Sequence, residues 1–239
     1  MRPARTRHVA VALLLLSAAG PGLCLTVFQA HFNGDPLTTE RQPPAEAEAL
    51  SYAPGRCGTL GLIVGDSTAL AYPAPGNISL YQGTAMVWCK PVGWRGGVDD
   101  ATRWIFLWQP EKANKVNMIG LVQNRTSTVN VHLRDAVPTS LAAMTKPALV
   151  FQDGQWVHIA AAWSAFQGVL RLFVDGRLVD ESRTTPPLHI GQTGPLLRIG
   201  GSHATAFGGV IDEVVVSDKC LDETGVRDEM RKPISAYGG

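Results

Sequence analysis

The chain has 239 residues, of which 45% are hydrophobic, enough for a packed core and too many for a disordered chain. Its 21 basic and 20 acidic residues leave a formal net charge of +1, which provides no electrostatic footprint for nucleic acid or for an anionic membrane surface. The 25 glycines and 16 prolines predict many turns, as an all-β fold requires.

The N-terminus has the pattern of a secretory signal peptide. Three arginines among the first seven residues precede an apolar run over residues 9–19, and small residues follow at 17–20. The run is too short to span a bilayer. We therefore expect a signal peptide over residues 1–24, with cleavage near 19–24, and a protein that is secreted or otherwise extracytoplasmic.

Export makes disulfides the default state of the cysteines. Cys24 lies at the expected cleavage region, so the disulfide candidates are Cys57, Cys89 and Cys220. If Cys24 leaves with the signal peptide, one pair and one odd thiol are expected; if it stays, three pairings are open. A buried free thiol is the alternative for each. No Cys/His cluster has the spacing of a zinc site.

After the signal peptide, the pattern predicts about a dozen short strands separated by turn residues. They are expected at 25–32, 57–64, 69–73, 83–91, 104–108, 116–122, 128–134, three further strands within 154–179, 196–201 and 210–216, followed by a short helix at 221–230. Segments 36–56 and 135–150 are expected to be irregular connections or helical turns. The fold class is therefore all-β, a sandwich of two antiparallel sheets with a short C-terminal helix.

The three strands within 154–179 carry the clearest pattern. Asp175-Gly176 accepts the positive φ angles of a two-residue hairpin turn. Before it, Leu170, Leu172 and Val174 alternate with polar positions, which predicts one buried face.

Four segments resemble the laminin-G-like jelly roll domain of the concanavalin A-like lectin/glucanase superfamily. They are Trp-x-His-Ile-Ala at 156–160, Leu-Arg-Leu-Phe-Val-Asp-Gly-Arg-Leu-Val at 170–179, Leu-Arg-Ile-Gly-Gly at 197–201, and Phe-Gly-Gly-Val-Ile-Asp-Glu-Val at 207–214. The resemblance covers roughly residues 25–230. It implies one domain over 25–239.

The resemblance also implies a structural Ca²⁺ site that uses Asp35 and Asp212. Physically, a carboxylate on the mostly apolar closing strand needs a partner. That partner is Ca²⁺, a backbone N–H group or an arginine such as Arg198.

Catalysis is not expected. The glucanases of the superfamily that this chain resembles carry Glu-x-Asp-x-x-Glu on one strand, which places the carboxylates in one cleft. This spacing is absent, and Asp212 and Glu213 are adjacent, so a regular strand would point them to opposite faces. Neither a Gly-x-Ser-x-Gly nor a His-Glu-x-x-His motif occurs.

Carbohydrate modules stack sugars on aromatic rings and hold hydroxyls with planar polar side chains. The candidate ligand-binding residues combine aromatics near loops or on one strand face with polar groups that share one face of the strand at 128–134. They are Trp94, Trp104, Trp108, Asn130, His132 and Arg134, with Tyr81 as a further aromatic. Trp88, Trp156 and Trp163 are expected in the core.

Together these features predict a secreted, non-catalytic binding domain that binds a glycan through a concave sheet. The alternative is an extracellular adhesion or scaffolding module that contacts a protein, and a remote third reading is a glycoside hydrolase. Expected partners are a glycan or an extracellular protein, with no nucleic acid and no membrane span.

Overall fold

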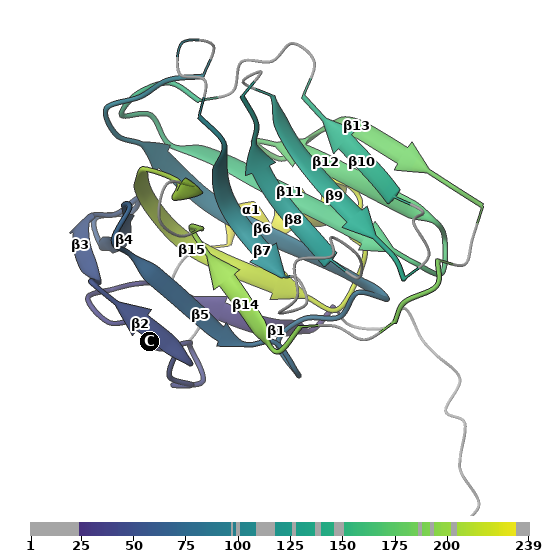
Figure 1. Ribbon diagram of the computed structural model, residues 1–239, viewed down its shortest axis with the longest axis horizontal. Coiled ribbons are helices and arrows are strands. Elements are labelled where there is room, and N and C mark those ends of the chain that lie inside the picture. The colour runs from purple at the N-terminus through teal and green to yellow at the C-terminus, as the bar shows by residue number, and fades with distance from the viewer. Residues whose placement is uncertain are drawn as a thin grey trace, which may run out of the picture.

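Two antiparallel sheets face each other in the computed structural model and enclose a single core (Figure 1). The structure describes residues 24–96, 98, 101–108, 118–125, 128–136, 140–145, 151–185, 188–191, 194–201 and 205–232. The expected signal peptide therefore lies almost entirely outside the described residues. The expected all-β sandwich with one short C-terminal helix is confirmed.

Sheet A holds the closing strand and the three-strand block. Its order is β13 (Arg177–Arg183), β12 (Val169–Val174), β11 (Val157–Ser164), β6 (Gln82–Pro91), β15 (Gly209–Ser217), β4 (Leu60–Val64) and β3 (Ser51–Pro54), with β1 (Thr26–Ala30) also paired to β15. The turn between β12 and β13 has positive φ at both central residues, 48° at Asp175 and 74° at Gly176. This confirms the predicted tight hairpin.

Sheet B faces the viewer in Figure 1. Its order is β10 (Ser140–Met144), β9 (Val129–Arg134), β8 (Met118–Gln123), β7 (Arg103–Trp108), β14 (Leu196–Ile199), β5 (Ala69–Pro73) and β2 (Glu46–Glu48). Alternate residues of its strands enter the core between the sheets, as period-two alternation requires.

Three strands appear where irregular connections or helical turns were expected. They are β2 and β3 within 36–56 and β10 within 135–150. The segments around β2 and β10 are rich in Ala, Glu, Leu and Met, residues with high helix propensity. Pairing of β2 with β5 and of β10 with β9 supplies backbone partners that override this local preference.

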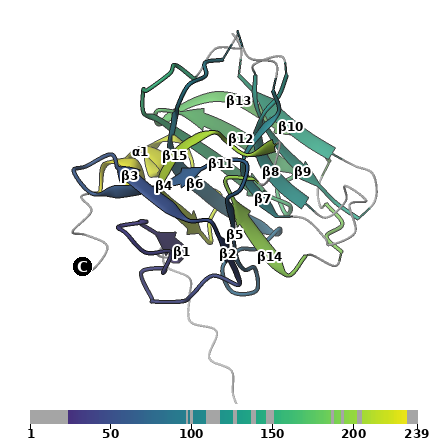
Figure 2. The same ribbon diagram turned by 60° about the vertical axis from the view of Figure 1, so that its left-hand side comes forward.

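Helix α1 (Glu223–Arg231) packs on the outer face of sheet A, the side away from sheet B (Figure 2). Asp222 caps it by accepting a hydrogen bond from the Gly225 N–H at 2.9 Å. Buried Val226 contacts a small apolar cluster that includes Ala160 and Ala162 of β11. These two short side chains leave room for the helix, so α1 covers part of this face.

The tryptophans divide differently from expectation. Trp163 is fully buried, as predicted. Trp88 and Trp156 are only half-buried and point away from sheet B, so the prediction that they belong to the core was wrong. The Arg56 guanidinium lies 3.6 Å from the centre of the Trp88 ring. A cation over the ring replaces core packing there.

All four cysteines are free thiols, so the expected disulfide does not form. Cys57 is exposed on the turn between β3 and β4, Cys220 is half-buried beside α1, and Cys89 is buried in the core. The three candidates belong to separate environments, which explains why no pair forms.

Candidate functional site

The outer face of sheet B is the sandwich face that no described helix covers. Residues in register across an antiparallel sheet share a face, and one outward row crosses the whole sheet. From one edge to the other the row contains Ala142, His132, Gly120, Leu107, Arg198, Ala71 and Glu46. His132 therefore stands between two of the smallest residues, neither of which has a side chain longer than a methyl group.

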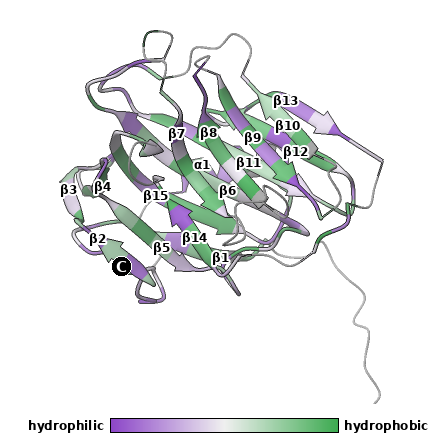
Figure 3. Ribbon diagram, in the orientation of Figure 1, coloured by the Kyte–Doolittle hydropathy of each residue, from purple (hydrophilic) through white to green (hydrophobic). Residues whose placement is uncertain are grey.

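The three polar candidates on β9 share this face, as predicted. Val129, Val131 and Leu133 point into the core, so Asn130, His132 and Arg134 point outward. Burial and the Arg134 cation lower the pKa of His132. His132 is therefore neutral at physiological pH and offers one donor and one acceptor. Figure 3 shows hydrophilic positions on β9 and β14 among the apolar positions of this sheet.

Asn130 is on this face, but its side chain forms hydrogen bonds within the protein. It is buried, and its amide donates hydrogen bonds to the Thr128 carbonyl oxygen and hydroxyl at 3.2 and 3.0 Å. Its donors are used inside the turn between β8 and β9. Asn130 therefore positions the start of β9, and it was wrongly expected to reach a ligand.

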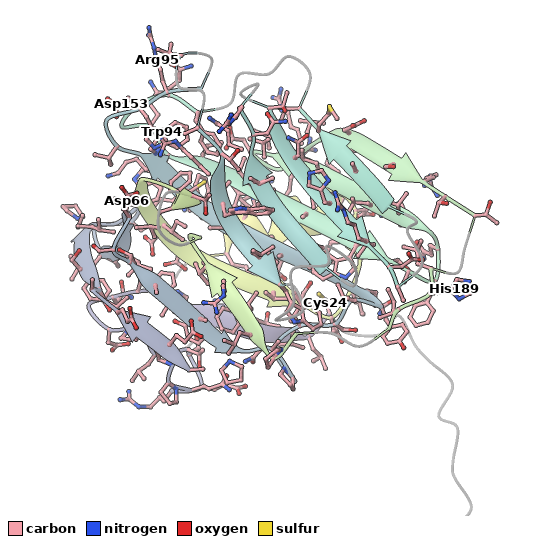
Figure 4. All side chains as sticks on the ribbon, viewed as in Figure 1. Cys24, Asp66, Trp94, Arg95, Asp153 and His189 are labelled. Atoms are coloured by element: carbon pink, nitrogen blue, oxygen red, sulfur yellow. The ribbon has the colours of Figure 1, made fainter. Side chains whose placement is uncertain are left out.

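Trp94 and Trp108 are 4% exposed and belong to the core. The Trp108 indole donates to the Gly194 carbonyl at 2.7 Å, and Trp94 packs against Phe151 and Phe207 at one end of the sandwich (Figure 4). Both were wrongly expected to be stacking platforms.

Trp104 is the half-buried tryptophan of the outer face. The pairing of β7 with β8 shifts register between Trp104 and Phe106, so Trp104 and Trp108 do not share a face as expected. A bulge of this kind inserts one extra residue and inverts the alternation beyond it. Trp104 lies opposite the outward-facing Val122 of β8, and Val122 in turn lies opposite Asn130 of β9. These three residues belong to the outward row next to the row of His132.

Sequence patterns did not find the ion pair at the β2 edge of this face. Arg198 pairs with Glu46 through both of its terminal nitrogens, spanning Ala71 between them. The alternation of β14 indicates that Arg198 points outward. Its partner Glu46 lies on β2, a segment that was not predicted to be a strand. The pair fixes the Arg198 guanidinium over the sheet.

Asp35 and Asp212 do not fit a calcium site in this structure. Asp212 is buried on β15 and accepts backbone N–H groups on both oxygens, from Arg56 at 3.0 Å and Glu213 at 2.9 Å. Both oxygens of this carboxylate therefore already have a hydrogen-bond donor from the backbone. Asp35 is exposed and accepts from the Leu37 N–H, and no group of three His, Cys, Asp or Glu residues forms a metal site among the described residues. Calcium binding stays a prediction that these donors do not support.

Asp212 and Glu213 both face the outer side of sheet A, which corrects the expectation of opposite faces. Glu213 has a φ of 51° at a bulge in β15, and this local conformation turns its side chain toward His31. Burial raises the pKa of Asp212 to about 7, against the opposing effect of its backbone hydrogen bonds. A hydrolase needs two carboxylates that reach a cleft, whereas Asp212 has no exposed surface.

Comparisons with known proteins agree with this architecture. A family model described as "Concanavalin A-like lectin/glucanases superfamily" matches residues 64–227. No curated protein matches the sequence. The described part of the chain contains no helix long and apolar enough to cross a membrane.

Several solved structures share the fold. One is domain 4 of AbnA, a GH43 extracellular arabinanase from Geobacillus stearothermophilus, in complex with arabinotriose, with 18% identity, a TM-score of 0.65, and coverage of 86% of this chain and 98% of that one. Another is the Ruminococcus gnavus IT-sialidase CBM40 bound to α2,3 sialyllactose, with 18% identity, a TM-score of 0.53, and coverage of 67% and 92%. A third is the botulinum neurotoxin serotype G binding domain, with 9% identity, a TM-score of 0.64, and coverage of 86% of this chain and half of that one.

Proposed function

The chain belongs to the concanavalin A-like lectin/glucanases superfamily, and from this premise we propose that it is a secreted, non-catalytic domain that binds a glycan on the outer face of sheet B. The observation that carries the proposal is His132, a neutral imidazole set between Ala142 and Gly120 on the face without a helix. The signal-peptide pattern at the N-terminus supports export.

The chemistry of the face suits sugar hydroxyls. The His132 imidazole and the Arg134 guanidinium are planar and polar, and they project from alternate positions of one strand. Half-buried Trp104 adds an aromatic ring in the neighbouring row. Planar donors and acceptors beside an aromatic ring are the elements that fix a sugar in orientation.

Relatives with the same fold support a sugar as the ligand class. Arabinotriose accompanies the arabinanase domain, and α2,3 sialyllactose accompanies the sialidase module. Their identities to this chain are low, so the likeness extends to the fold and to the class of ligand that we propose.

A glycan array probed with residues 25–239 tests the proposal. We expect binding to one set of glycans, reduced about tenfold or more by His132→Ala and by Arg134→Ala, because each removes hydrogen bonds to the ligand. Arg177→Ala is the matched control, since Arg177 is exposed on β13 of the other sheet. Repeating the array with a calcium chelator tests the predicted metal. A silent array, or equal loss with the control, overturns the proposal.

One observation favours a protein partner instead. Tyr81 and Phe166 are 49% and 60% exposed, and their rings stack with centroids 5.6 Å apart. The Ala165 N–H donates to the Tyr81 carbonyl at 2.7 Å, which holds the two loops together. Exposed aromatics are enriched where proteins meet. If the array is silent and Tyr81→Ala with Phe166→Ala abolishes binding to an extracellular protein without lowering stability, this second function is the correct one.

A further inference from the structure

A small pocket lies between the outer face of sheet A and the C-terminal end of α1. We call it the α1 pocket; its lining includes Trp88, His158 and Glu213 from the sheet side and Met230 from the helix. It is on the opposite sheet from the proposed glycan face, so an inference about it does not depend on that proposal.

Two buried polar atoms in this pocket lack a hydrogen-bond partner among the described residues. His158 is 2% exposed, and its Nδ1 is unpartnered. Glu213 is 8% exposed; its Oε2 lies 2.6 Å from Nδ1 of His31, whereas its Oε1 is unpartnered. Leaving such atoms unpaired is unfavourable, and native folds retain few of them. Two in one pocket point to a bound group that satisfies both.

The two atoms specify the chemistry of that group. Burial, with a contribution from the Arg56 cation, lowers the pKa of His158 to about 3, so the imidazole is neutral. A neutral imidazole nitrogen and a carboxylate oxygen are matched by a hydroxyl, which donates one hydrogen and also accepts. A single hydroxyl can donate its hydrogen to Oε1 of Glu213 and accept a hydrogen bond from the Nδ1–H tautomer of the His158 ring.

The rest of the lining favours an uncharged ligand. Arg56 stacks on Trp88, and Lys232 forms an ion pair with Glu229, so both cations of the lining already have a contact within the protein. The side chains of Met86, Val215 and Met230 form apolar walls. Apolar walls around a hydroxyl partner fit the C–H groups of the carbon that carries it.

We propose that the α1 pocket is a second binding site, which takes the hydroxymethyl group of a neutral sugar or polyol. The pocket is small, and a primary alcohol is the hydroxyl that projects furthest from a sugar ring. The domain then holds hydroxyl-bearing ligands on two opposite sides.

The chain carries its own reporters for the test. Of its five methionines, Met86 and Met230 line the α1 pocket, and Met144 lies on β10 of sheet B. The full domain is labelled with ¹³C at the methionine methyls and titrated with the methyl glycosides of glucose, galactose and mannose. Each is compared with its 6-deoxy counterpart, which lacks only the primary hydroxyl.

We expect at least one glycoside to shift the Met86 and Met230 methyl signals saturably, and its 6-deoxy counterpart to bind at least about tenfold more weakly. Glu213→Gln should bind the unmodified glycoside more weakly than the wild type by a similar factor. Glu48→Gln, at an exposed position of β2, should bind it with unchanged affinity. The comparison of sugars in the unmodified protein stands even if Glu213→Gln does not fold.

The proposal is overturned if no glycoside moves the Met86 and Met230 signals, in which case water satisfies the two atoms. Equal binding of the 6-deoxy sugars overturns it as well. A shift confined to Met144 overturns the α1 pocket and supports the glycan face on sheet B, so the two proposals fail separately.

Discussion

The buried carboxylate of Asp212 accepts a hydrogen bond from the backbone N–H of Arg56 at 3.0 Å, across 156 residues of sequence. The contact ties the turn between β3 and β4 to the closing strand β15. A Cβ on Gly55 would lie 2.7 Å from Oδ2 of Asp212, so the turn approaches the carboxylate too closely for a side chain at that position. Asp212 therefore stabilises the fold from a site where its charge is unfavourable.

The first prediction concerns the pH dependence that follows. Burial raises the pKa of Asp212 from 3.8 to about 7, so between about pH 4 and 7 the folded protein binds a proton that the unfolded chain releases. The contribution of this group to stability is present below pH 4 and is lost as pH rises through 7, by up to about 4 kcal/mol at ~1.4 kcal/mol per unit.

Asp212→Asn cannot ionise and removes this slope, although the loss of an acceptor costs about 1–3 kcal/mol at low pH. Urea unfolding of both proteins from pH 4 to 7 measures the difference. Parallel profiles would show that Asp212 does not titrate in this range.

The second prediction concerns His158, whose contribution to stability falls as pH decreases, whereas that of Asp212 falls as pH increases. Burial and the Arg56 cation lower its pKa from 6.5 to about 3, so the folded protein keeps the ring neutral while the unfolded chain takes up a proton. Stability from this group is present above pH 6.5 and is lost as pH falls toward 3. His158→Gln should therefore lose less stability than the wild type between pH 6.5 and 4 in the same unfolding experiment. A steeper loss in the variant contradicts the assignment.

The third prediction separates the two tryptophans of β7. Trp108→Ala removes a core side chain with a buried hydrogen bond, so the free energy of unfolding should fall by about 3–5 kcal/mol. Trp104→Ala, at the half-buried outer position, should cost less than half as much and instead weaken glycan binding. Thermal unfolding and the glycan array are measured on both variants. The reverse order of stability would show that the bulge does not expose Trp104.

The fourth prediction tests the β12–β13 turn. Gly176 has a φ of 74°, and a Cβ there would lie 2.9 Å from Cγ of Arg227 on α1. Gly176→Ala should lower stability by about 1–2 kcal/mol, because it combines a left-handed conformation with crowding against the helix. Gly65→Ala is the control, since a Cβ at Gly65 meets no atom within 4 Å. Equal stability of the two variants in urea would contradict the turn geometry.

The fifth prediction concerns the thiols. With all four cysteines free, the unfolded full-length chain should react with four equivalents of a thiol reagent without prior reduction. In the folded protein exposed Cys57 should react first. Cys89 should react only on unfolding, because burial raises the pKa of its thiol and excludes the reagent. Fewer than four equivalents from the unreduced chain would indicate a disulfide.

Short-range patterns predicted the fold well and the composition of the proposed glycan face only in part. Alternation and the Asp175-Gly176 turn located β12 and β13, because both signals act within a few residues. The alternation of β9 also placed His132 and Arg134 on one face. The bulges in β7 and β15 were not predictable, since each depends on pairing with a distant strand; they reversed the expected facing of Trp104 and of Glu213. The unpartnered atoms of the α1 pocket required the helix to be placed on sheet A.

The bulge in β7 also makes this strand sensitive to length. A single-residue deletion between Trp104 and Phe106 would restore strict alternation and exchange interior for exterior along one end of the strand. Either Trp104 would be driven into the filled core or the aromatic residues after it would be turned into water. We therefore expect insertions and deletions at this point to be selected against more strongly than substitutions of the same residues, because the number of residues there determines which side chains face outward from sheet B.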